Sequence, residues 1–445
     1  MPVPCPTHRD VLARRPASGH RCAAAAGAHT PRWPIPARLR AGLVLCVLVV
    51  HAPFGCGDSG GAAPCSDCAD AACAPGDWTC GGDVLHAPAH FDGHLSLAAG
   101  PDGSVAFAYH DAAVGSLVVG RVRPGEPPRE IVADTGAGPR GVGRYTDCAF
   151  DPQGRLHVVY QDVDLRQLRH AVLDGLDVVR VETVDEAPDT GYRPALAVDP
   201  ASRLHVTYYD ATERALRYAR LDETWTRETL PPPPGDATTH DYGSFSDVAL
   251  RAGHPIVAYY DRAGGNLVLA ERSGGQWSAQ IVDGVDPLLG TDSGDVGRWP
   301  SLHVDDKGNV SVAYQDAGHG ALRFATAVKG ELRIETIDDG ARQDEATGAR
   351  REGIVGAFAA LVVPPAGTPR VYYLDGTTMR VRRRLRSDTG WGPAQGPDTT
   401  ALAGLWLDAV VLTDGSVAVA YERWVPVDEG DTVRVGRSMT WWFDP

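Results

Sequence analysis

The sequence has little lysine and methionine, and it contains no long hydrophobic run. Only two lysines, Lys307 and Lys329, stand against forty arginines, and there are three methionines in 445 residues. The longest apolar run, residues 41–50, is too short to span a bilayer. Aromatic residues make up 7%, whereas there are 51 glycines and 34 prolines. This composition favours many short strands and turns over long helices.

Sequence motifs of the common enzyme classes are also missing. The chain has no H-E-x-x-H, no P-loop, no dinucleotide-binding fingerprint and no nucleophile elbow. His240 and Asp241 form a tempting acid–base pair, but no nucleophile motif accompanies them. The loop Asp292-Ser-Gly-Asp295 offers carboxylates to Ca²⁺, yet it lacks the ligand count of an EF-hand, so a solvated acidic loop is the alternative. We expect no other cofactor or metal.

The first 56 residues have the features of an export signal. Residues 1–40 are rich in arginine, and the apolar run that follows fits the hydrophobic region of a signal peptide. The stretch Pro53-Phe-Gly-Cys56 resembles a bacterial lipoprotein signal, in which a small residue precedes a cysteine that becomes lipidated. Pro53 departs from it, since leucine is usual there. We expect an exported, envelope-attached lipoprotein; ordinary cleavage into the periplasm or medium, with Cys56 as a spare thiol, is the alternative.

Six of the nine cysteines lie beyond the apolar run. Residues 57–77 read as a flexible tether, and the cysteines in and just after it are closely spaced: Cys65, Cys68, Cys73 and Cys80. In an exported chain this group favours two disulfides, with a thiolate metal site as the alternative. Cys148 stands alone in an apolar stretch and is expected to be a buried free thiol.

The charge of the mature chain argues against nucleic acid as a partner. Residues 1–56 hold seven arginines and one aspartate, which leaves 35 basic and 56 acidic side chains, a net charge of −21. An acidic domain of this kind is repelled by phosphate backbones. We expect a monomer that meets the membrane only through its lipid anchor.

A phrase ending in Tyr-x-Asp recurs along the chain. Its tyrosines are spaced 51, 48, 51, 55, 59 and 48 residues apart, which is typical of an array of repeated units. The copies begin at Tyr109, Tyr160, Tyr208, Tyr259, Tyr314 and Tyr373, with a degenerate seventh at Tyr421.

Each unit is expected to contain four antiparallel strands. The clearest copy predicts strands over 194–198, 204–209, 216–219 and 225–230, with Asp- and Gly-containing hairpin turns. Seven such units predict an all-β fold, a seven-bladed β-propeller over residues 78–445. The last unit is one strand short, so we expect residues 78–85 to close the ring by pairing into it. An open solenoid is the competing layout.

The copies at 154–171, 203–219, 256–270 and 308–325 carry a family resemblance. They are similar to the Tyr-x-Asp repeats of exported bacterial propellers, and more distantly to sialidase-like propellers. The Asp-boxes of sialidases, Ser-x-Asp-x-Gly-x-Thr-Trp, do not occur here. The resemblance therefore implies the fold and export, without a sialidase site.

Residues repeated in nearly every unit are expected to be structural. The Asp should accept backbone N–H groups of the loop that follows it, and the Tyr should pack between blades. Function is better sought where the copies differ. One position at the entry of each first strand reads His94, Tyr145, Arg193, Phe245, Trp299, Phe358 and Trp406. We expect Phe245, Phe358 and Trp406 to be core residues.

The candidate ligand-binding residues lie at this position, at its neighbour and in long connections. They are Arg144, Tyr145, Tyr192, Arg193, His240, Tyr242, Arg298, Trp299 and Arg351. Aromatic rings stack on sugars, and arginines clamp carboxylates or phosphates. The connections 231–242, 283–297 and 338–352 should lie on the same face. The first hypothesis is a binding or scaffold module for a glycan, peptide or protein. The alternative is a hydrolase or lyase of an acidic polysaccharide, with Arg144, Arg193, Arg298 and Arg351 as clamps.

Overall fold

The computed structural model describes residues 91–444, apart from 92, 124–125, 127, 236–239, 286–291, 329, 344–349, 366, 398–401 and 429–432. These residues belong to one compact unit, Ala72–Pro445. The described part consists of strands and connections, without helices, and so contains no helix that could cross a membrane. The export signal, the tether, the five cysteines from Cys56 to Cys80 and the strand predicted over 78–85 lie outside the described residues.

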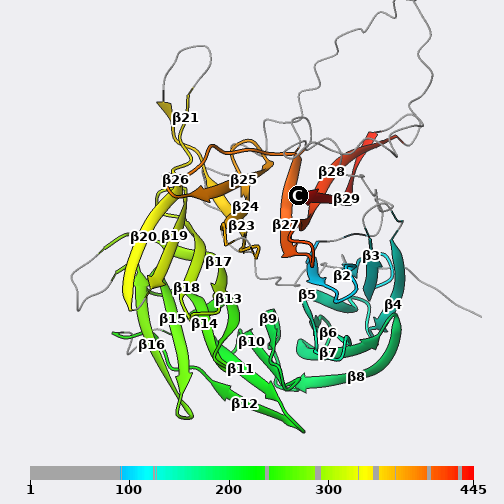
Figure 1. The fold of residues 1–445 in the computed structure, drawn as a ribbon. Helices are drawn as coiled ribbons and strands as arrows, with labels where there is room; N and C mark the ends of the chain where they lie inside the picture. Colours follow the sequence, from blue (N-terminus) through cyan, green and yellow to red (C-terminus); the bar gives the residue numbers. More distant parts are fainter. Residues whose placement is uncertain are drawn as a thin grey trace, which may run out of the picture. The chain divides into compact units, whose positions relative to one another are not determined.

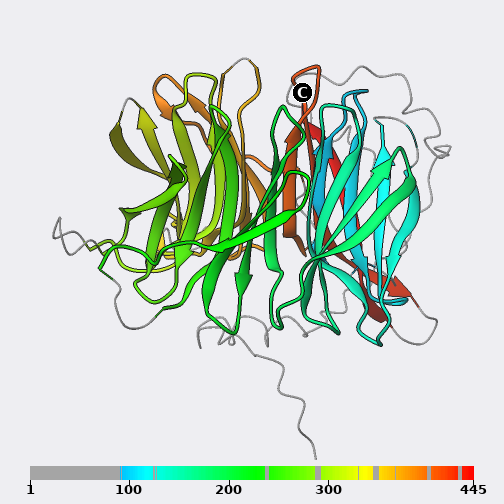
Figure 2. The same cartoon turned by 90° about the horizontal axis from the view of Figure 1, so that it is seen from below.

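The strands form a seven-bladed β-propeller, as predicted. Successive antiparallel sheets follow one another around a central axis (Figure 1), and Figure 2 shows the same ring from below. Six sheets contain four strands each, in chain order from the innermost strand outward, and the seventh contains three in the described residues. A two-stranded hairpin, β21–β22, lies in the connection between the fifth and sixth blades.

The strand boundaries extend the predicted strands by one or two residues at most in the clearest unit. Blades one to three comprise β1 (Ser96–Ala99), β2 (Val105–Asp111), β3 (Ser116–Val122), β4 (Arg129–Thr135); β5 (Val142–Phe150), β6 (Leu156–Asp162), β7 (Gln167–Asp174), β8 (Asp177–Asp185); and β9 (Tyr192–Val198), β10 (Leu204–Asp210), β11 (Ala215–Leu221), β12 (Trp225–Thr229). Blades four and five comprise β13 (Tyr242–Arg251), β14 (His254–Asp261), β15 (Asn266–Ser273), β16 (Gln276–Asp283); and β17 (Val296–Val304), β18 (Val310–Asp316), β19 (Ala321–Val328), β20 (Glu331–Asp338).

The last two blades are less regular. They comprise the hairpin β21 (Arg342–Gln343) and β22 (Arg350–Arg351); β23 (Val355–Val362), β24 (Arg370–Asp375), β25 (Arg380–Ser387), β26 (Gly390–Trp391); and β27 (Leu402–Val411), β28 (Val417–Asp428), β29 (Val433–Asp444). The outermost strand of the sixth blade has only two residues, extended by a bridge between Arg383 and Gln395.

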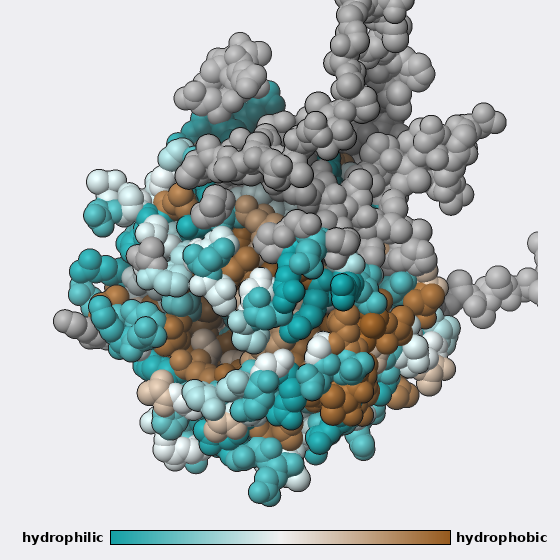
Figure 3. Space-filling view, turned by 45° about the vertical axis from the view of Figure 1, so that its right-hand side comes forward, coloured by the Kyte–Doolittle hydropathy of each residue, from teal (hydrophilic) through white to brown (hydrophobic). Residues whose placement is uncertain are grey.

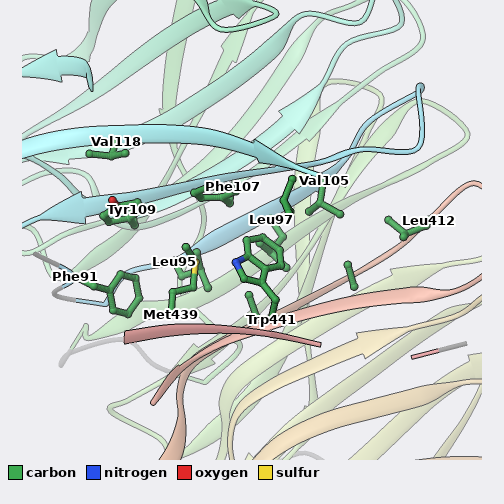
Figure 4. Close-up of a cluster of buried hydrophobic side chains, with 13 residues drawn as sticks. Phe91, Leu95, Leu97, Val105, Phe107, Tyr109, Val118, Leu412, Met439 and Trp441 are labelled. Carbon is green, nitrogen blue, oxygen red and sulfur yellow. The ribbon is translucent and has the colours of Figure 1, made fainter. Parts of the chain in front are cut away.

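The hydrophobic core lies between the blades. Seven clusters of buried side chains are found, and each combines residues from two neighbouring sheets. The cluster that joins the last blade to the first contains Phe107 of β2 and Trp441 of β29, whose ring centroids are 5.2 Å apart (Figure 4). Cys148 is buried in the cluster between the first two blades and is a free thiol, as predicted. Blade-to-blade packing thus continues around the ring.

The repeated Tyr-x-Asp residues have the structural roles predicted for them. Asp210 accepts hydrogen bonds from the backbone N–H groups of Thr212 and Glu213, both at 3.0 Å. The hydroxyl of buried Tyr208 donates a 2.6 Å hydrogen bond to Asp185, the last residue of the preceding blade. Arg217 of the third strand lies 3.2 Å from Asp210 and 3.6 Å from Asp185. Each such group joins two blades by charge-assisted bonds.

The loop after the second strand and the connection to the next blade lie on the same face. The loop residue Gly115 accepts a hydrogen bond from Val142 N–H at the start of the next blade. The same bond recurs at every following junction, between Arg166 and Thr190, Arg214 and Tyr242, Gly265 and Val296, Gly320 and Val355, and Met379 and Ala403. This face therefore carries the entrances of the inner strands, where the candidate residues lie.

Candidate functional site

The seven inner strands place one residue each at the same register. In every blade this residue lies two positions before the residue that pairs with the one preceding the repeat tyrosine, or its counterpart. These residues, called here the axial ring, are His94, Tyr145, Arg193, Phe245, Trp299, Phe358 and Trp406. All except Phe245 have left-handed φ values between 49° and 58°. Such values are strained for bulky side chains, and residues of this kind cluster at ligand sites.

A glycine two residues earlier makes this arrangement possible in six blades. Gly143 has a φ of 101°, and a Cβ atom there would lie 2.9 Å from the Cα of Leu117 in the preceding blade. The equivalent glycines, which also have positive φ, are Gly191, Gly243, Gly297, Gly356 and Gly404. Only glycine allows this close approach. The resulting Gly-x-aromatic pattern, Gly-x-Arg in one blade, is a signal in the sequence that the repeat pattern alone did not reveal.

The side chains of the axial ring pack against one another. Ring centroids are 3.9 Å apart for His94 and Trp406, and 4.0 Å apart for Trp299 and Phe358. The Arg193 guanidinium lies among them, with its carbon 4.4 Å from the ring centroid of Phe245, 4.6 Å from Trp299, 5.4 Å from Tyr145 and 5.6 Å from Trp406. Contacts within 6 Å of a ring centroid are favourable for a cation.

A cavity of about 170 Å³ opens at the level of the axial ring. Six of the seven axial-ring residues line it, all but Phe245, together with the residues that follow them, such as Thr146 and Pro194. Apolar surface gathers in the hollow of the ring in Figure 3, with polar surface around it. Phe358 and Trp406, predicted from the sequence as core residues only, pack on the core and also line the cavity.

Arg193 is the charged residue of this cavity. Burial lowers the pKa of its guanidinium to about 10, so it remains protonated at neutral pH. Burial, reinforced by Arg193 and Arg144, lowers the pKa of His94 well below its ordinary value, so that this imidazole is neutral. Among the described residues, no carboxylate lies within ion-pair distance of Arg193, and no lining residue is acidic.

Two residues beyond the axial ring, three aspartates connect neighbouring inner strands. Asp147 accepts the N–H of Leu196 in the next blade at 2.6 Å, and Asp247 accepts that of Leu302 at 2.7 Å. Asp408 accepts the N–H of Leu97 at 2.8 Å and so joins the last blade to the first. Each carboxylate also accepts the N–H of its following residue. Burial raises the pKa of Asp247 and of Asp408 to about 6.

The other candidate residues do not line the cavity. Arg298 pairs with Asp295 at 2.5 Å, and Tyr260 donates a 2.8 Å hydrogen bond to the same carboxylate. Arg144 and Tyr192 lie on inner strands beside the axial ring and are half-buried. The structure therefore does not bring the four candidate arginines together.

Three candidates from the connections lie elsewhere. Tyr242 is buried, and its hydroxyl donates a 2.7 Å hydrogen bond to the carbonyl of Leu230. His240 is exposed beside it, with ring centroids 6.2 Å apart, and Arg351 is exposed on the β21–β22 hairpin.

The proposed calcium loop is bonded within the protein. Asp292 accepts the N–H of Gly294, and Asp295 is bonded to Arg298 and Tyr260 as described above. In the described part of the chain, no group of three or more His, Cys, Asp or Glu side chains is placed to hold a metal ion.

Comparisons with known proteins give only remote structural likeness. No family model matches the sequence, and no curated protein matches it. A protein of unknown function from Dyadobacter fermentans is 15% identical, with a TM-score of 0.42, over 80% of this chain and 97% of that one.

Two further solved structures are similar to a comparable degree. A mutant of the Aleuria aurantia lectin in complex with alpha-methyl-L-fucoside is 11% identical, with a TM-score of 0.38, over 79% of this chain and 97% of the lectin. The NanB sialidase from Streptococcus pneumoniae is 10% identical, with a TM-score of 0.42, over 81% of this chain and 70% of the sialidase. At these values the matches carry no argument about function.

Proposed function

We propose that this propeller is an exported binding module that recognises its partner at the mouth of the axial channel. The partner is a glycan, peptide or protein at the envelope surface, and a glycan fits the site best. The chain is held at the envelope by lipidated Cys56. One observation carries the proposal: at the axial ring, equivalent positions hold different side chains that enclose a cavity, whereas the blades otherwise repeat the same bonds.

The composition of the cavity supports a glycan. Tyr145, Trp299, Phe358 and Trp406 offer aromatic surface beside Arg193, and a pocket with much aromatic surface and few polar groups is typical of a small-ligand site. A module that binds needs no acid–base pair, and no carboxylate lines the cavity in the described residues.

The hydrolase or lyase alternative loses the geometry that it requires. It needs several arginines around one substrate, but only Arg193 of the four lines the cavity, while Arg298 is paired with Asp295. It also needs a catalytic carboxylate at the substrate, whereas the aspartates nearest along the inner strands each accept two backbone N–H groups. No specific observation favours it over binding.

A glycan array with the full chain tests the proposal. We expect the wild-type protein to bind a defined set of glycans and Trp299→Ala to lose binding by about ten-fold or more, since truncating a central aromatic anchor typically costs at least about 2 kcal/mol. Trp277→Ala, which removes the same side chain from the outer strand β16, is the matched control and should bind normally. Equal binding by both variants would remove the axial ring from the proposal, and no binding by the wild type would remove glycans.

A further inference from the structure

Arg193 presents an unusual electrostatic situation. Its guanidinium lies within about 6 Å of four aromatic centroids, yet the described residues provide no hydrogen-bond acceptor for its N–H groups. Other half-buried arginines of this propeller are paired: Arg323, for example, lies 2.8 Å from Asp283 and 2.7 Å from Asp316. Burying an unpaired charge is costly. Aromatic faces compensate for part of this cost, and the N–H edge of the guanidinium remains uncompensated.

The surroundings of Arg193 leave room for an external anion. His94 faces it as a neutral imidazole, because burial and the nearby arginines lower its pKa. The nearest residues of the following layer, such as Ala195 on its own strand, are not acidic, and Asp147 is already bonded to Leu196 and Cys148 N–H groups. A negatively charged ligand group would therefore meet a single positive charge in a mostly apolar cavity.

We propose that this cavity binds a carboxylate group on a ring-sized ligand, with Arg193 as its cationic partner and the axial ring holding the body of the ligand. The inference rests on the proposed function, and it specifies the chemical class of the group bound. The ligand source is either an acidic sugar or a free aromatic acid; both offer the same carboxylate chemistry.

The geometry favours a carboxylate over a tetrahedral anion. A guanidinium offers parallel N–H donors that match a planar carboxylate in a bidentate pair. The faces of this guanidinium are covered by the Phe245 and Trp299 rings at 4.4 and 4.6 Å, so an anion must approach in the guanidinium plane. A planar group fits that direction, whereas a phosphate or sulfate would press oxygen atoms toward the aromatic faces.

The size of the cavity limits the ligand to one ring. A cavity of about 150 Å³ can hold one benzene molecule. The cavity at the axial ring measures about 170 Å³ and so accepts a group of that size. A longer glycan or molecule would have to present its acidic ring at the end of the chain, with the rest outside the channel mouth.

Calorimetric titration of the full chain with matched pairs of probes tests this inference. The pairs are sodium glucuronate against glucose, and sodium benzoate against benzamide. We expect at least one carboxylate to bind about ten-fold or more tightly than its neutral partner, because hydrogen bonds to charged groups contribute roughly 1.5–3 kcal/mol. The pair with the larger preference identifies the source: a preference for glucuronate indicates an acidic sugar, and one for benzoate an aromatic acid.

Two substitutions assign the preference to Arg193. Arg193→Met keeps the length and apolar contacts and should abolish the carboxylate preference. Arg193→Lys keeps the charge without the planar fork and should retain part of it, and this variant decides the matter if the methionine variant does not fold. Arg333→Ala, which truncates an exposed arginine on the outer strand β20, should leave the preference intact.

Three results would overturn the inference: no binding of either carboxylate, equal binding of charged and neutral probes, or an unchanged preference in Arg193→Met. Its failure differs from failure of the proposed function. If neutral glycans bind on the array and depend on Trp299, the module is confirmed while the carboxylate assignment is lost.

Discussion

The contacts between blades and the axial ring obey opposite rules, although both are built from the same repeat. Between blades, Tyr, Asp and Arg recur with the same bonds: Tyr160 donates to Asp134 at 2.6 Å, just as Tyr208 donates to Asp185. At the axial ring, the backbone repeats and the side chain changes from blade to blade. The backbone there is held by glycines, by the aspartate bridges and by the strand pairing, so the side chain is free of structural duty.

This difference separates architecture from recognition. A ring of identical groups has the symmetry of the scaffold, whereas a single ligand requires an asymmetric set of contacts. Arg193 is the clearest departure, since one blade contributes a cation where the others contribute rings. We therefore expect substitutions in the repeated contacts to change stability, and substitutions in the axial ring to change binding.

The largest effect on stability is expected from Asp283→Ala. This buried carboxylate accepts a 2.6 Å hydrogen bond from Tyr314 and lies 2.8 Å from Arg323. Removing it leaves a half-buried guanidinium and a buried hydroxyl with one acceptor fewer, and breaking such a pair costs about 3–5 kcal/mol. Urea denaturation of the full chain measures the free energy of unfolding.

The matched control for that substitution is Glu331→Ala on the same strand pair. Glu331 pairs with Arg333 at 3.2 Å, but both side chains are about 70% exposed, so the loss should be below about 1 kcal/mol. A similar loss for both variants would contradict the view that the repeated bonds hold the blades together.

The aspartate bridges belong to the scaffold but lie beside the channel, and they should make stability depend on pH. Burial raises the pKa of Asp247 from its ordinary 3.8 to about 6, so the folded protein binds more protons than the unfolded chain between those values. The free energy of unfolding should therefore fall as pH rises from about 4 to about 6, by on the order of 2–3 kcal/mol for this group. Above pH 6 the contribution levels off.

Asp247→Ser isolates this contribution. Serine occupies the same position in the fifth blade, where Ser301 accepts the N–H of Leu361 at 2.9 Å, so the bridge to Leu302 can be kept without a titrating group. We expect the variant to gain stability relative to the wild type as pH rises from 4 to 7, measured by urea denaturation at each pH.

A control group with the opposite shift checks the sign. Hydrogen bonds from Ser416 lower the pKa of exposed Asp414, so its contribution is present above its ordinary pKa and is lost as pH falls. Asp414→Ser should give a small difference of opposite slope. Equal slopes for the two variants would mean that burial does not raise the pKa of Asp247.

The sequence predicted the propeller because its signals are local and repeated seven times. Each Tyr-x-Asp copy marks the end of a second strand, and alternation with Asp–Gly turns marks the strands around it. The last sheet has three strands in the described residues, as its missing segment predicted. Closure by residues 78–85 stays a prediction.

The site was predicted only in part, because its geometry depends on register across blades. Counting back from the repeats found the seven equivalent positions, yet one-residue shifts decide which side chain enters the channel. Thus Arg193 and Trp299 line the cavity, while their neighbours Tyr192 and Arg298 do not. Phe358 and Trp406 were predicted as core residues because an aromatic residue in a strand is usually buried. The glycine two positions earlier would have identified the turn inward.

The smallest effect is expected where the repeat itself has a gap. Tyr314 donates to Asp283, whereas the hydroxyl of Tyr259, at the same position of the preceding blade, has no hydrogen-bond partner. Leu230 follows β12 at the place where the next blade carries Asp283. Tyr314→Phe should cost about 1.5–3 kcal/mol, the contribution of a hydrogen bond to a charged group, whereas Tyr259→Phe removes a buried hydroxyl that bonds to nothing and should be neutral or slightly stabilising. Both substitutions delete the same atom from fully buried rings, so the difference in the free energy of unfolding isolates the bond. An equal loss in both would show that the hydroxyl acts through packing, and the repeated Tyr–Asp pairs would then no longer explain how the blades are joined.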